Sequence, residues 1–292
     1  MRRGERRAFN VMTNTNWQPW VGRTESRADV VTPVPVAALA ATLDRDEPPP
    51  ASGDPLPPLW HWLYFLPLHR QSEIGPDGHA KRGGFLPPVP LPRRMWAGGR
   101  LTFLQPLLVG DPIARTSTIR DVTTKEGRSG PLVFVLVRHE IAGPRGTAIV
   151  EEHDIVYRDT PAAGERPVAP PRAPVDATWI RALRPDDVLL FRYSALTFNG
   201  HRIHYDRRYV TQIEGYPGLI VHGPLIATLL LDLMRRHLPD AVVARFSFRA
   251  MSPLFDIAEF TVNGRRDGDS TVALWAANAD GGLAMDATAT LR

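Results

Sequence analysis

The stretch GPLIATLLLDLMRRHL, residues 223–238, decides the fold. It opens with Gly-Pro, a pair typical of a helix start, and closes on Arg235, Arg236 and His237, whose charges suit the negative end of a helix dipole. Apolar side chains occupy nearly all positions between these ends. A helix that is apolar on most sides is buried on most sides. The sequence therefore predicts a β-sheet wrapped around this helix.

Strand-like segments follow this helix at 245–256, 258–266, 270–279 and 283–291. A shorter apolar helix is predicted at 32–44, with Thr32 as N-cap and Pro33 at the first helical position, and strands follow it at 100–111, 112–124, 132–142 and 146–158. The phrases RLTFLQPLLVGD and RFSFRAMSPLFD form a weak internal repeat. The connections are too short for the helices that parallel strands require. We therefore predict the α+β class, with two hot-dog units in tandem (a double hot-dog), each an antiparallel sheet wrapped around a central helix.

Prolines mark the predicted domain boundary. The segment 160–176 holds five of the 29 prolines and no aromatic residue, which is typical of a rigid linker. Strand-like sequence flanks it, including DDVLLFRYSAL at 186–196. We predict four parts, namely a flexible extension, an N-terminal structural and substrate-binding unit, a linker and a C-terminal catalytic unit, at 1–16, 17–159, 160–176 and 177–292.

Composition excludes several classes of protein. The 35 basic and 31 acidic residues are interspersed, and only MRRGERR at the amino terminus is a basic cluster, so no nucleic-acid partner is predicted. No apolar run reaches about 18 residues, which predicts neither a membrane span nor a membrane partner. No secretory signal is readable, and the cytoplasm is expected. The absence of cysteine rules out disulfides, thiolate metal sites and a cysteine nucleophile.

The side chains best suited to proton transfer and ligand binding are clustered in TFNGHRIHYD, residues 197–206. An imidazole such as His204 can transfer a proton near neutral pH, and the amide of Asn199 can orient a water. The guanidinium of Arg202 suits a carboxylate or a phosphate. We expect this segment to face the start of the 223–238 helix, where the backbone amide of Gly223 can stabilise an oxyanion.

A zinc site and a Ser-His-Asp triad are two other interpretations of the same region. A zinc site would use histidine ligands with a nearby carboxylate, but no fixed ligand spacing such as HExxH is present, so no metal is predicted. The residues considered were His201, His204 and His222, with Asp206 or Glu214. A Ser-His-Asp triad through Ser194 lacks the G-x-S-x-G turn that exposes a nucleophilic serine.

The pattern SALTFNGHRIHYD, followed by GLIVHGPLIATLLLDL, resembles the MaoC-like hydratases and dehydratases of acyl thioesters. It is most similar to the branch that holds the mesaconyl-C4-CoA and itaconyl-CoA hydratases and the type 2 hydroxyacyl-thioester dehydratases. The resemblance extends to WVGRTESRADVVTPVPVAALAATLD and RMWAGGRLTFLQPLLVGD, and so covers nearly everything after residue 16.

The resemblance implies roles for particular residues. The family signature Asp-x-Asn-Pro-Leu-His places His204 on the catalytic histidine, and Gly223 corresponds to the glycine whose amide holds the thioester carbonyl. Asn199 stands in place of the aspartate, which is a departure from the family, while His201 and Arg202 replace asparagine and proline. We therefore expect His204 to transfer the proton and Asn199 to orient the water. The role of His201, as a second acid/base or as an orienting group, stays open.

The implied reaction is a hydro-lyase reaction without a cofactor. Water would be added to, or removed from, the C=C bond of mesaconyl-C4-CoA or itaconyl-CoA, with citramalyl-CoA as the hydrated product. Arg202 would bind the second carboxylate, and Tyr205 and His222 would contact the substrate. A dehydratase of 3-hydroxyacyl-carrier-protein or CoA thioesters, a thioesterase and a non-catalytic acyl-thioester-binding subunit remain alternatives. The chain is expected to be a monomer or a homodimer.

Overall fold

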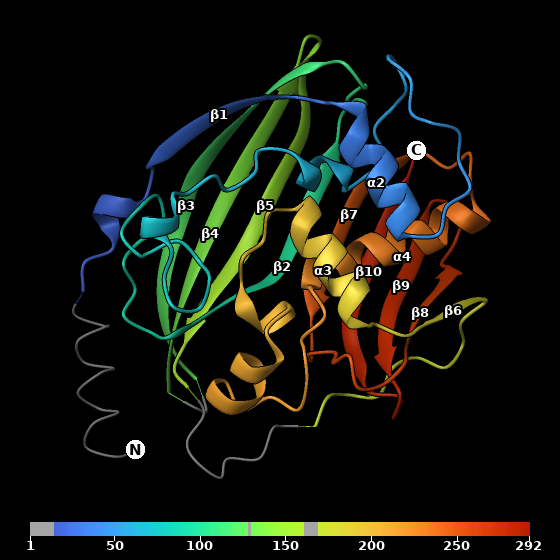
Figure 1. Cartoon of the computed structure of the whole chain (residues 1–292). Coiled ribbons are helices and arrows are strands. Elements are labelled where there is room, and N and C mark those ends of the chain that lie inside the picture. Colours follow the sequence, from blue (N-terminus) through green and yellow to red (C-terminus); the bar gives the residue numbers. More distant parts are fainter. Residues whose placement is uncertain (1–14, 128–129, 161–168) are drawn as a thin grey trace.

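A computed structural model describes residues 15–127, 130–160 and 169–292. Its strands form one antiparallel sheet in the order β1-β3-β4-β5-β2-β7-β10-β9-β8-β6 (Figure 1). In chain order the strands are β1 (Thr24–Val30), β2 (Arg93–Phe103), β3 (Pro112–Gly127), β4 (Gly130–Gly143), β5 (Gly146–Arg158), β6 (Trp179–Leu183), β7 (Val243–Ala250), β8 (Phe260–Arg266), β9 (Thr271–Asn278) and β10 (Leu283–Leu291). The antiparallel sheet confirms the predicted α+β class.

The two halves of the chain each contribute five strands and meet where β2 pairs with β7. In this pair Leu101 lies opposite Phe246, Arg100 opposite Ser247 and Thr102 opposite Arg245. The two phrases of the weak internal repeat are therefore neighbours, related by a local twofold axis through the Leu101–Phe246 pair. The sheet continues from one half into the other without an exposed edge between them.

Helix α4 (Gly223–His237) is the central helix of the second half and packs on β6, β8, β9 and β10. Every residue from 225 to 234 is buried, as its apolar surface predicted. One of them is Asp232, whose carboxylate is paired with Arg45, Arg181 and Arg236 at 2.6, 2.9 and 2.8 Å. These ion pairs fix the helix to the first half, to β6 and to its own last turn.

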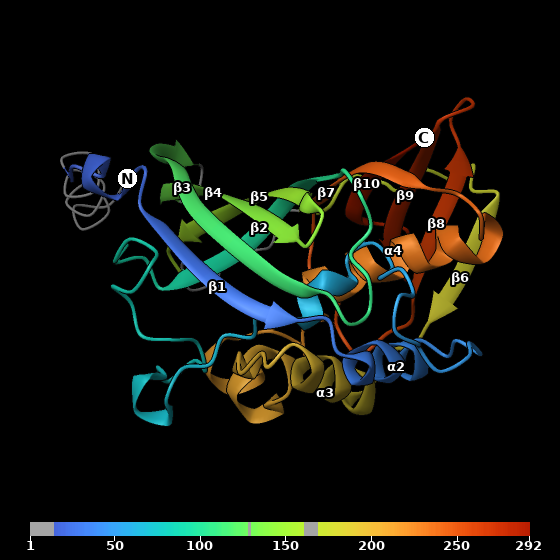
Figure 2. The same cartoon turned by 90° about the horizontal axis from the view of Figure 1, so that it is seen from above.

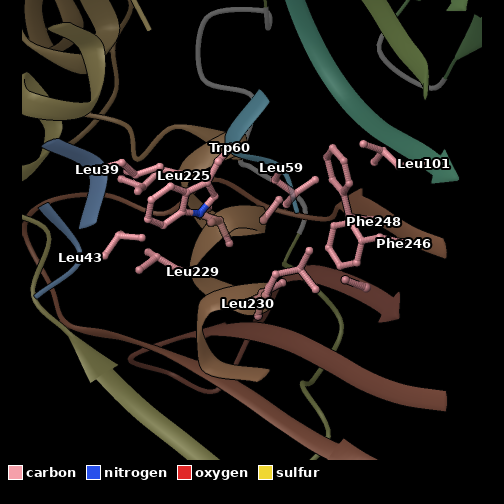
Figure 3. Close-up of a cluster of buried hydrophobic side chains, with 14 of the residues drawn as sticks. Leu39, Leu43, Leu59, Trp60, Leu101, Leu225, Leu229, Leu230, Phe246 and Phe248 are labelled. Atoms are coloured by element: carbon pink, nitrogen blue, oxygen red, sulfur yellow. The ribbon is translucent and has the colours of Figure 1, made fainter. Parts of the chain in front are cut away.

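Two further helices cover α4. Helix α2 (Pro33–Thr42) follows the N-cap Thr32 as predicted, and its main neighbours are α3 (Asp187–Leu196) and the 3-10 turn η2 (Trp60–Leu63). Figure 2 shows α2 and α3 together on one side of α4, with the second-half strands on the other. In Figure 3, Leu39 of α2, the C-cap residue Leu43 and Trp60 of η2 lie beside Leu225 and Leu229 of α4 within one apolar core.

The helical state of α3 corrects the strand-like interpretation of 186–196. Leu190 and Tyr193 are buried at helical spacing, and the carboxylate of Asp186 accepts the backbone N–H of Leu189 at 2.7 Å, which caps the first turn. Because α2 packs beside α3, it takes a place different from that of α4. Residues of η2 and of the segment after it contact the first-half strands: His61 and Trp62 are hydrogen-bonded to Glu151 of β5, and the N–H of Phe65 donates to Asp29 of β1.

Most of the predicted extension, residues 1–14, and the stretch 161–168 of the predicted linker lie outside the described residues. The end of the linker docks on the start of β10: the N–H of Leu283 donates to the carbonyl of Pro171 at 2.8 Å. Among the helices of the described ranges, none is long and apolar enough to cross a membrane.

Candidate functional site

The segment 197–206 leaves the end of α3 and turns back onto the start of α4. Phe198 adopts a positive φ of 48°, and the side-chain oxygen of Asn199 then accepts the backbone N–H of His201 at 3.0 Å. This local hydrogen bond is a typical asparagine turn. The N–H of Ile220 donates to the carbonyl of Ile203 at 3.0 Å, which joins the segment to the residues before α4. The predicted approach of this segment to the helix start is thus present.

His204 is the buried member of this segment, and its ring is held from two sides. Nδ1 donates a hydrogen bond to the carbonyl of Ile220 at 2.7 Å, so Nε2 is left without the proton. The ring stacks on His222 with 3.8 Å between centroids. Burial lowers the pKa of His204 to about 4, although the Ile220 hydrogen bond opposes that shift. His204 is therefore a neutral base at neutral pH.

His222 is the N-cap residue of α4 and pairs with a serine. Its Nε2 lies 2.8 Å from Oγ of Ser194, while its Nδ1 is buried with no partner among the described residues. A serine-histidine pair is therefore present, but the acid that would complete a triad is not among the residues described. The next residue, Gly223, begins α4, and its amide makes no hydrogen bond to a described residue. A Cβ at Gly223 would meet no atom within 4 Å, so there is open space beside the start of α4.

The first half of the chain supplies a histidine to the site that the sequence did not predict. The ring of His79 contacts that of His201, with 3.9 Å between centroids and the planes tilted by 39°, and its Nδ1 lies 2.9 Å from a carboxylate oxygen of Asp77. The loop that carries both residues is tied to the catalytic segment, because the N–H of Arg202 donates to the carbonyl of Asp77 at 2.9 Å. The first half, predicted as a structural and substrate-binding unit, thus also places a histidine beside the catalytic segment.

The electrostatics of this group favour neutral imidazoles beside one carboxylate. Burial lowers the pKa of His201 to about 2 and lowers that of His79, against the pull of Asp77. Burial opposes ionisation of Asp77, yet its hydrogen bond and charge interaction with His79 bring its pKa well below the ordinary value. Asp77, His79 and His201 also place three potential metal-ligand atoms within 4.8 Å of one another, and no other such group occurs in the described ranges. The trio considered from the sequence, with His204 and His222, does not form one.

A cavity of about 740 Å³ lies beside these residues. Of the predicted site residues, Asn199 and Tyr205 line it, and the Tyr205 hydroxyl donates to the carbonyl of Gly200 at 3.0 Å. His79, Ser194 and Pro224 line it as well. The other predicted residues are not part of the lining and stand behind it, namely His201, His204, His222, Gly223 and Arg202. His201 touches the lining residue His79, and His222 touches the lining residue Ser194.

The side chain of Arg202 is bound to groups of the protein itself, whereas the sequence predicted that it binds a carboxylate of the substrate. Its Nε and Nη2 donate to one carboxylate oxygen of Asp206 at 3.0 and 2.7 Å, and its Nη1 donates to the carbonyl of Pro76 at 2.9 Å. The guanidinium also lies over the ring of Tyr209. Arg202 therefore holds the loop of Asp77 against the catalytic segment, and this arrangement does not support the predicted role as a carboxylate ligand.

The arginines of 91–100 are placed by a strand, because β2 begins at Arg93. Arg93 donates to the Tyr216 hydroxyl at 3.0 Å, and Arg100 is paired with Glu152 and Asp154. Arg94 lines the cavity, whereas Arg93 and Arg100 do not.

Residues 59–256 match the family of hydroxyacyl-thioester dehydratase type 2. The mesaconyl-C(4)-CoA hydratase of Chloroflexus aurantiacus is 49% identical over 280 residues, which cover 96% of this chain and 99% of that protein.

Solved structures share the fold. A MaoC-like dehydratase superposes with a TM-score of 0.69 at 15% identity, covering 94% of this chain and 99% of that one. A Mycobacterium tuberculosis protein described as a double hotdog fold gives a TM-score of 0.57 at 13% identity, covering 93% and 96%. These likenesses confirm the predicted double hot-dog fold.

Proposed function

The chain belongs to the hydroxyacyl-thioester dehydratase type 2 family, and we propose that it adds water to the C=C bond of an enoyl-CoA thioester. Mesaconyl-C4-CoA is the proposed substrate, because a relative of that activity is 49% identical over nearly the whole chain. Itaconyl-CoA is the second substrate to test. The observation that carries the proposal is the neutral, tautomer-fixed His204 beside the start of the buried helix α4.

His204 is the proposed base. Its unprotonated Nε2 takes a proton from water while the hydroxyl oxygen bonds to the β-carbon of the enoyl group. Because His204 lies behind the cavity wall, this water has to stand between its ring and the acyl chain. Asn199 lines the cavity there, and since its side-chain oxygen is occupied by the His201 amide, its NH2 group is the part left to donate to the water.

The start of α4 is the proposed oxyanion site. As the water attacks, the electron pair of the C=C bond moves toward the α-carbon and the thioester oxygen. The free amide of Gly223 and the helix dipole stabilise that oxygen. The protonated His204 then gives its proton to the α-carbon, which completes the 3-hydroxyacyl thioester. His201, with a pKa of about 2, is proposed as an orienting group rather than a second acid.

The test is an enoyl-thioester absorbance assay with wild-type protein and His204→Ala. Wild type should bleach the enoyl band of mesaconyl-C4-CoA without releasing thiol, and the variant should lose roughly 100-fold or more in kcat. His237→Ala is the matched control, because His237 stacks on Trp179 at the far end of the same helix. Full activity in folded His204→Ala would remove His204 from the mechanism. Thiol release would instead indicate a thioesterase, and no reaction on CoA or carrier-protein thioesters would indicate a binding subunit.

The proposed enzyme works in the cytoplasm, consistent with a chain that has no cysteine. A monomer and a homodimer both agree with a sheet whose two halves are already joined through β2 and β7. Light scattering on the purified protein distinguishes the two.

A further inference from the structure

The wall of the cavity opposite the catalytic segment is the concave face of the first-half strands, and it carries ionisable groups. Arg115 on β3, His139 on β4, and Glu151 and His153 on β5 all line the cavity, with Trp96 of β2 beside them. The strand register places His139 opposite both Ser117 and Glu151. A pocket for an aliphatic acyl chain would present mainly apolar side chains here. This wall is suited to a polar group.

The carboxylate on this wall, that of Glu151, already has hydrogen-bond donors around it. Glu151 is fully buried, and its carboxylate accepts hydrogen bonds from Nε2 of His61 and Nε1 of Trp62, each at 2.9 Å, and a third from His153. Burial opposes ionisation of Glu151, but the charge and hydrogen bonds of His153 and His61 hold its pKa well below the usual range. With three donors around it, this carboxylate has little capacity to bind a further cation.

One arginine on the same wall has no side-chain hydrogen-bond or ion-pair partner among the described residues. Three arginines line the cavity. Arg27 donates to the carbonyl of Leu66 at 3.2 Å, and Arg94 is hydrogen-bonded to the Tyr157 hydroxyl. Arg115, in contrast, makes no side-chain hydrogen bond or ion pair with any residue that the structure describes, and its buried Nε has no partner. The carboxylates of Glu25 and Glu151 attract its charge without forming an ion pair, and Arg27 repels it. Its guanidinium lies over the ring of Phe65, 5.1 Å from the centroid.

We propose that Arg115 binds a free carboxylate of the acyl group, so that the cavity selects thioesters of dicarboxylic acids. The assignment rests on the proposed function, because it takes the acyl thioester as the ligand of this cavity. A planar guanidinium offers paired N–H groups that match a carboxylate, and an unpaired charge withdrawn from water gains most from such a partner. The thioester end would then face Asn199 and the start of α4, while the second carboxylate faces the first-half strands.

The test compares the binding of two saturated four-carbon thioesters, succinyl-CoA and butyryl-CoA, by titration calorimetry. They differ by a terminal carboxylate, and neither has a C=C bond to hydrate. Wild type should bind succinyl-CoA more tightly, and Arg115→Met should weaken that binding roughly 10- to 100-fold while leaving butyryl-CoA unchanged. Arg138→Met is the matched control: Arg138 is adjacent to His139 on β4, paired with Glu140 at 2.8 Å, and does not line the cavity.

Arg115→Lys keeps the charge but not the forked donor, and it should retain part of the preference in a folded protein. The proposal is overturned if wild type shows no preference for succinyl-CoA. It is also overturned if folded Arg115→Met weakens both ligands equally. Because the ligands cannot react, the outcome does not depend on turnover. An enzyme that fails to hydrate any enoyl-CoA, yet shows an Arg115-dependent preference, would contradict the proposed reaction and keep this carboxylate site.

Discussion

Burial sets the protonation state of His204. An imidazole in water titrates near pH 6.5, whereas burial lowers the pKa of His204 to about 4. The base form therefore persists well into the acidic range. We expect kcat/KM for the enoyl thioester to stay level from about pH 8 to about pH 5 and to fall with an apparent pKa nearer 4 than 6.5.

Initial rates over this range provide the measurement. Enzyme held at each pH and returned to neutral buffer should recover its activity, which separates titration from unfolding. An acid limb centred near 6.5 would mean that a more exposed group is the base.

The spacing of residues in the sequence was sufficient to predict some residues of the site but not others. His204, Asn199 and Gly223 lie within 25 residues of one another, so one turn of chain brings them together. His79 was missed because it comes from a distant loop with no periodic pattern. Arg115 was missed because only strand register shows that it faces inward. The available signal was alternation on β3, where an arginine occupies the same face as the buried Ile113, Ser117 and Ile119.

Among the elements, the loop that carries Asp77 and His79 has the tightest contact with the catalytic segment. Gly78 adopts a φ of +89°, and a side chain there would overlap the carbonyl oxygen of Gly200. Gly78→Ala should therefore push the loop away from Asn199 and its neighbours. Because small displacements of catalytic groups are costly, we expect kcat to fall roughly 10- to 100-fold. Steady-state kinetics and melting temperature measured together test this.

A matched control is available in the same loop region. Gly83 has a φ of +94°, but no atom lies near the position that its side chain would take. Gly83→Ala thus introduces the same backbone strain without the collision, and it should keep its kcat. Equal losses in both variants would show that strain, rather than the contact with Gly200, limits activity.

Where an apolar run was short, the sequence did not show correctly whether it forms a helix or a strand. The run at 186–196 contains Val, Leu, Phe and Tyr, which suit a strand, yet the Asp186 cap and tertiary packing make it α3. Helix α4 was predicted without difficulty because its length and all-round apolar surface have few alternatives. The position of α2 beside α3 depends on packing that no local pattern encodes.

At the scale of the whole molecule, the cavity lies between the first-half strands and the catalytic segment of the second half. Histidines are concentrated around it, and burial lowers the pKa of five of them, namely His79, His139, His201, His204 and His222. In the unfolded chain these groups titrate near pH 6.5. Between pH 6.5 and about 4, the value for His204, the unfolded chain binds protons that the folded chain refuses.

The sign of the linkage follows from this difference in bound protons. Stability should be at its full value above pH 6.5 and should fall as the pH is lowered toward about 4, because protonation favours the unfolded chain. Asp77 and Glu151, whose pKa values are lowered, act in the same direction only at still lower pH. Urea unfolding at several pH values between 7.5 and 4.5 measures the slope. His139→Asn should make it shallower, whereas a stability that is level across the range would show that the folded protein protonates these imidazoles freely.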